Sequence, residues 1–112
     1  MLAKAIARHV RMTPRKASYV ITPLRQRTVA EALAWLAATN RRAAKPVAKV
    51  VASAFANAAR LYPELRAEDV IISKAVADQG PTWKRFRAAA FGRAARILKR
   101  TTHITVELDK KT

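Results

Sequence analysis

The chain has 112 residues, and 23 lysines and arginines against 7 acidic residues give it a net charge of +16. Such a charge repels itself in the free fold and favours a polyanionic partner, either nucleic acid or an anionic membrane surface. The absence of cysteine excludes disulfides and thiolate metal sites. No apolar run reaches transmembrane length and no signal peptide is recognisable, so we expect one soluble intracellular domain, residues 1–112.

The first half of the chain predicts one strand followed by three helices. Residues 4–12 alternate as a strand, with Ile6 and Val10 on the same face. Thr13 is suited to cap a first helix, which Pro23 should end or kink near residues 21–22. Thr28 matches the start of a capping box that opens a second helix. The apolar positions expected to be buried by these two helices are Ala17, Val20, Ile21, Leu24, Val29, Ala32, Leu33 and Leu36.

A third helix is expected from about residue 43 to residue 61, where Tyr62 and Pro63 end it. Its apolar stripe has helical spacing and comprises Val47, Val50, Val51, Ala54, Phe55, Ala58 and Leu61.

Two strands follow. Residues 70–77 place Val70, Ile72 and Val76 on one face, and residues 103–108 alternate Ile104, Val106 and Leu108 with polar side chains.

These last two strands bracket residues 80–101, a stretch with seven basic side chains and no acidic one. Burying so many cations without partners would be costly, so the stretch should point outward, toward an anion. Its conformation is open at this point. Helical spacing after Phe86 supports an amphipathic helix, and propensity slightly favours that reading, although Gly92 weakens it. The alternative is a long β-hairpin with its tip near residues 89–92.

Several segments resemble the large-subunit ribosomal protein L twenty-two family. Residues 3–5 and 11–16 resemble its first strand and helix start, and residues 52–58 its third helix. Residues 78–87 and 92–94 resemble its extended loop, and residues 99–106 its final strand. The order and spacing of these motifs match along almost the whole chain.

The resemblance implies an α+β fold with three helices packed on a three-stranded antiparallel sheet, and residues 80–101 as a long protruding β-hairpin. It implies binding to 23S rRNA, a role in subunit assembly, and a hairpin that lines the nascent-peptide exit tunnel. It further implies neighbouring large-subunit proteins and the nascent peptide as partners, a monomer within the ribosome, and a cytoplasmic, ribosome-bound location. Three departures stand out: Ala88 and Ala89 where a proline and an arginine are common, Pro23 in the first helix, and Gln26 where glycine is common.

We expect two RNA-contacting surfaces. Arginine can bind two phosphate oxygens at once, and aromatic rings can stack on unpaired bases. The body should contribute Lys4, Arg8, Arg11, Arg15 and Lys16. The arm should contribute Trp83, Lys84, Arg85, Phe86, Arg87, Phe91, Arg93, Arg96, Lys99 and Arg100.

Other functional classes have weaker support. Without a cysteine nucleophile, a glycine-rich phosphate loop or paired carboxylates, the sequence predicts no enzyme, and it predicts no cofactor. His9 and His103 are expected to be hydrogen-bonding residues, not metal ligands. The main alternative is an architectural DNA-binding protein with a basic β-ribbon arm, which would be a dimer. A membrane-active cationic segment at residues 86–100 is a third possibility.

Overall fold

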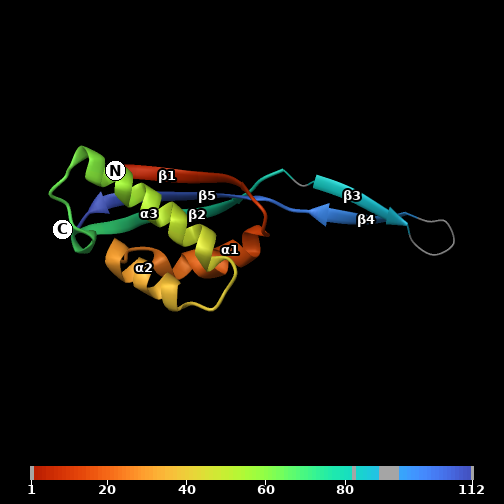
Figure 1. Ribbon diagram of the computed structural model, residues 1–112, viewed down its shortest axis with the longest axis horizontal. Coiled ribbons are helices and arrows are strands. Elements are labelled where there is room, and N and C mark those ends of the chain that lie inside the picture. The colour runs from red at the N-terminus through yellow and green to blue at the C-terminus, as the bar shows by residue number, and fades with distance from the viewer. Residues whose placement is uncertain (1, 82, 89–93, 112) are drawn as a thin grey trace.

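The computed structural model describes residues 2–81, 83–88 and 94–111, and within these it describes residues 83–88 and 94–99 by their backbone. The elements follow one another as β1 (Ala3–Val10), α1 (Pro14–Ile21), η1 (Thr22–Leu24), α2 (Val29–Ala38), α3 (Ala44–Leu61), η2 (Ala67–Asp69), β2 (Val70–Gln79), β3 (Trp83–Ala88), β4 (Ala94–Lys99) and β5 (Thr102–Lys110). Strand β5 lies between β1 and β2 and is antiparallel to both. The described residues therefore confirm the predicted α+β class (Figure 1).

The helix boundaries follow from local chemistry. The Thr13 side chain accepts a hydrogen bond from the backbone N–H of Lys16, which caps α1. Pro23 has no N–H to continue the helical ladder, and the chain tightens into the 3₁₀ turn η1 as soon as α1 ends. The Thr28 side chain accepts from the N–H of Glu31 and caps α2. The predicted starts of these helices and the predicted end of α1 are confirmed.

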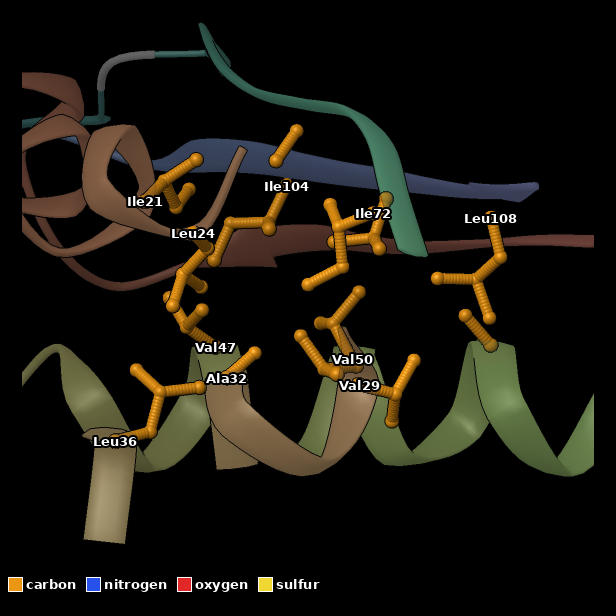
Figure 2. Packing of buried hydrophobic residues seen from close by; sticks show 14 of the residues in the cluster. Ile21, Leu24, Val29, Ala32, Leu36, Val47, Val50, Ile72, Ile104 and Leu108 are labelled. Carbon is orange, nitrogen blue, oxygen red and sulfur yellow. The ribbon is translucent and has the colours of Figure 1, made fainter. Parts of the chain in front are cut away.

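The core lies between one face of the sheet and the helices. In Figure 2, Ile72, Ile104 and Leu108 extend from the sheet toward the helices. They meet residues of η1, α2 and α3, of which Leu24, Val29 and Val47 are fully buried. Most of the predicted core positions are confirmed. Leu33 and Phe55 are half-buried at its border. Leu61 is 67% exposed, so its predicted burial is wrong: the last residue of α3 extends past the sheet.

Two irregularities overturn predicted strand faces. The register of β1 shifts between Ala7 and Val10, where His9 has a φ of 59°. Val10 therefore packs against the core, whereas Ile6 is 42% exposed, although the alternation had placed them on one face.

Strand β2 shows the same effect. Its register shifts between Ile72 and Lys74, and the extra residue reverses the alternation beyond it. Ala75 is fully buried and Val76 is only half-buried, the opposite of the predicted assignment. The predicted face of β5 is correct, because Ile104, Val106 and Leu108 are all fully buried.

Strands β3 and β4 pair antiparallel from Trp83 with Lys99 to Ala88 with Ala94. This backbone pairing confirms the hairpin and excludes the helix that propensity favoured. The hairpin continues the β2–β5 pair across a junction at which the N–H of Gly80 donates to the carbonyl of Thr101 over 2.9 Å. The molecule is elongated, 64 × 25 × 16 Å, with β3 and β4 extending from one end of the body (Figure 1). The predicted tip, residues 89–92, lies outside the described residues.

Candidate nucleic-acid interface

A groove of about 1070 Å³ lies where the body meets the hairpin. It is lined by the end of β1, the start of α1, the loop before α3, the first half of α3, and Arg100, which lies between β4 and β5. Seven of its twelve lining residues are basic and none is acidic. We call this surface the cationic groove, and its basic residues are Arg11, Lys16, Arg41, Arg42, Lys45, Lys49 and Arg100.

One buried hydrogen bond positions a wall of the cationic groove. Thr102, fully buried at the start of β5, donates its hydroxyl to the carbonyl of Met12 over 2.8 Å. Because Thr102 directly follows the hairpin, this bond fixes the turn between β1 and α1 beside the base of the arm. It thereby brings Arg11 and Lys16 close to Arg100, although these residues are far apart in the sequence.

Two helices begin at the cationic groove, and both begin with cations. Neither α1 nor α3 has an acidic residue in its first turn, where the helix dipole would favour one. No side chain caps the start of α3 at Ala43. Placing Lys16 and Lys45 in these turns lowers helix stability slightly, and a bound anion would reverse that effect.

An aromatic contact orients the loop before α3. The guanidinium carbon of Arg41 lies 5.5 Å from the ring centroid of Tyr19, on α1, in a cation–π arrangement. Both residues are exposed, so Arg41 remains accessible to solvent and to ligands. Arg41 is therefore presented at the groove with less freedom than an ordinary surface arginine.

The structure brings only some of the predicted RNA-contacting residues together. Arg11, Lys16 and Arg100 line the cationic groove. Lys4, Arg8 and Arg15 are exposed, but they do not line it. On the arm, Trp83, Lys84, Arg85, Phe86, Arg87, Arg96 and Lys99 are placed by their backbone within β3 and β4. Phe91 and Arg93 lie outside the described residues.

Four groove residues were missed by the sequence reasoning: Arg41, Arg42, Lys45 and Lys49. A signal for them exists. Residues 32–63 contain no acidic residue, and these four cations cluster near the middle of that run. Spacing along one helix cannot show that α1 and the residues near the base of the arm supply the opposite wall of the groove.

The two histidines lie together, although they are 94 positions apart in the sequence. The N–H of His9 donates to Nδ1 of His103 over 3.2 Å, and the rings meet edge to face with centroids 5.0 Å apart. The His103 ring accepts a hydrogen bond, as predicted, whereas His9 contributes its backbone N–H and a ring contact. Within the described ranges, no three potential ligand residues form a group that could hold a metal ion.

Five of the seven acidic residues lie at the end of the body away from the hairpin, where Arg60, Arg66, Lys110 and Lys111 also lie, whereas Asp78 stands near the hairpin, at the end of β2. Glu64, Glu68 and Asp69 follow the C-terminus of α3, and Glu107 and Asp109 stand toward the end of β5 (Figure 1). The cationic groove and the arm occupy the opposite end.

In the described part of the chain, no helix combines the length and hydropathy that crossing a bilayer requires.

Comparisons with known proteins identify the family of this chain. The family described as Ribosomal protein L22p/L17e matches residues 5–109. A curated relative, the large ribosomal subunit protein uL22 of Halothermothrix orenii, is 45% identical over 111 residues, which cover 99% of this chain and 97% of the relative. With a family match over nearly its full length and a relative this similar, the chain belongs to the uL22 family of large-subunit ribosomal proteins.

Proposed function

We propose that the protein is a structural constituent of the large ribosomal subunit that binds 23S rRNA through the cationic groove and the hairpin arm. The observation that carries this proposal is the convergence of seven cations, without an acid, on one groove. Cations so close together repel one another, and phosphates of folded RNA neutralise them. The role is structural, not catalytic: the protein holds RNA helices together where their phosphates approach, which aids subunit assembly.

The arm extends this binding surface beyond the body. Two paired strands of six residues each project from the end that carries the groove. A two-stranded ribbon can pass between RNA helices. We expect the basic residues of its strands to bind phosphates: Lys84, Arg85 and Arg87 on β3, and Arg96 and Lys99 on β4. The resemblance to the family supports a location of the arm at the exit tunnel, through which the nascent peptide passes. The protein acts there as a monomer among neighbouring ribosomal proteins, on cytoplasmic ribosomes.

The proposal is tested by removing the four basic side chains of the groove that the sequence did not predict to contact RNA. A variant with Arg41→Ala, Arg42→Ala, Lys45→Ala and Lys49→Ala changes exposed side chains and leaves the core intact. Binding to a 23S rRNA transcript is measured over a range of KCl concentrations. Each lost phosphate contact should reduce the slope of log K against log salt by roughly 0.7–0.9, so four contacts reduce it by about 3.

A matched control removes the same charge from the other end of the body. Arg60, Arg66, Lys110 and Lys111 are exposed, and replacing all four with alanine also lowers the net charge by four. We expect the salt slope and the affinity for rRNA to decrease much less in this control than in the groove variant. Equal losses in both variants would mean that only net charge matters, and tighter binding of duplex DNA than of rRNA would favour the architectural alternative.

A further inference from the structure

A second pocket, of about 310 Å³, adjoins the cationic groove. It lies between β1 and α3, shares Val10, Pro46 and Lys49 with the groove, and has Lys49 as its single charged lining residue. The rest of its lining consists of small or apolar side chains and one serine: Ala5, Ile6, Ala7, Val10, Pro46, Val50 and Ser53. An apolar pocket thus continues directly from a phosphate-binding surface.

Among the described residues, no strand pairs with the backbone edge that borders this pocket. The edge of β2 is covered by the chain's own loop, where the N–H of Gln26 donates to Ile72 and the N–H of Ile72 donates to Arg27. Among the described strands, β1 pairs with β5 alone. The carbonyl of Lys4 faces outward, since the side chain of Asn57 donates to it from α3.

Backbone groups alternate in direction along an edge strand with a period of two residues. The N–H and C=O of Ile6, two residues after Lys4 and before the register shift, therefore face the same open edge. Ile6 also lines the pocket and is 42% exposed. The pocket consequently offers a hydrogen-bond donor and an acceptor beside an apolar surface.

Size and charge point to one kind of occupant. The volume lies at the lower end of the ~300–1,000 Å³ typical of ligand pockets, so it suits one small flat group and not a helix. The surrounding cations, Lys4 and Arg8 on β1 and Lys49 at the shared wall, suit a group joined to phosphates. A nucleotide combines a flat base, whose edge donates and accepts hydrogen bonds, with such a phosphate.

We propose that this pocket receives the base of one unpaired nucleotide from the RNA whose backbone lies in the cationic groove. Lys49 binds the phosphate of that nucleotide, Pro46 and Ile6 contact the faces of the base, and the backbone of Ile6 bonds to its edge. The inference rests on the proposed function, because it assumes RNA in the groove. It adds a site that accepts a base, where the groove alone binds backbone.

Filling the pocket tests the inference. Ser53 is exposed on α3, so Ser53→Phe places a ring in the pocket without altering charge or core. Affinity for the 23S rRNA transcript should fall roughly tenfold, as expected for loss of one base contact, with the salt slope unchanged. Ala52→Phe, on an exposed neighbour that does not line the pocket, is the control and should keep wild-type affinity. Unchanged affinity in Ser53→Phe would overturn the inference.

A second measurement needs no ribosomal RNA and so separates this inference from the proposed function. In NMR titrations, AMP should shift the signals of Ile6, Ala7 and Val50, whereas ribose 5-phosphate, which has no base, should shift signals of the cationic groove alone. Ser53→Phe should remove the base-dependent shifts. Equal shifts of the pocket signals by both compounds would refute a base site. Stronger shifts with a tetrapeptide of alternating glutamate and valine would assign the pocket to a protein strand instead.

Discussion

Replacing Gly80 with alanine tests whether tight packing holds the arm to the body. A Cβ at this position would lie 2.6 Å from Oγ1 of Thr101, and 3.1 and 3.3 Å from Cε1 and Nε2 of the His103 ring. Thr101 cannot easily turn away. It is 2% exposed, and its hydroxyl donates to the carbonyl of Pro81 over 2.6 Å.

The magnitude follows from three terms. Overpacking of this kind costs about 1–3 kcal/mol of unfolding free energy. Turning the Thr101 hydroxyl away would forfeit a hydrogen bond worth about 1 kcal/mol. Against these, alanine restricts the unfolded chain and returns about 0.4–1 kcal/mol. We therefore expect Gly80→Ala to lower the free energy of unfolding by about 2 kcal/mol.

Urea unfolding followed by circular dichroism measures this loss, which should lower the midpoint by about 1 M for a domain of this size. Thr101→Ala removes the atom that the new Cβ would strike. In that background, Gly80→Ala should cost at least about 1 kcal/mol less than in the wild type, a coupling that a double-mutant cycle isolates. If Gly80→Ala unfolds at the same urea concentration as the wild type or higher, the junction is not tightly packed.

Two further substitutions probe the backbone around the body. Gln26 has a φ of 66°, and glycine adopts this conformation without strain, so Gln26→Gly should raise the unfolding free energy by about 0.5–1 kcal/mol. A lower urea midpoint would contradict that reasoning. Thr102→Val keeps the shape of a fully buried side chain but removes its 2.8 Å bond to the Met12 carbonyl, so it should cost about 1–2 kcal/mol. The half-buried Thr105 is the control, and an equal loss in Thr105→Val would show that the Met12 bond is not responsible.

Local signals were sufficient to predict the helices and the central strand. The caps at Thr13 and Thr28 and the break at Pro23 act within a few residues of where they stand, so their effects can be predicted from sequence. The faces of β1 and β2 could not be predicted in full. A bulge depends on how two strands pair, and nothing in the alternation of β2 marks the extra residue that turns Ala75 inward.

The hairpin and the cationic groove show two further limits. Alanine-rich residues in the arm favour a helix locally, and only the resemblance to a family selected the paired strands that the structure has. The groove joins Arg11 and Lys16 to Arg41 and Arg100, which lie far from them in the sequence. A charge pattern read along one segment cannot reveal a surface that three segments build together.

The uneven distribution of charge along the molecule has a consequence for how the protein meets its partner. The molecule is 64 Å long, whereas electrostatic fields decay over about 8 Å at physiological ionic strength, so the carboxylates at the far end of the body cannot neutralise the cations of the groove and arm. Near a polyanion the molecule experiences a torque that turns the hairpin and groove foremost before contact. Diffusive encounters are thereby biased toward one orientation, and the bias weakens as added salt shortens the range of the field.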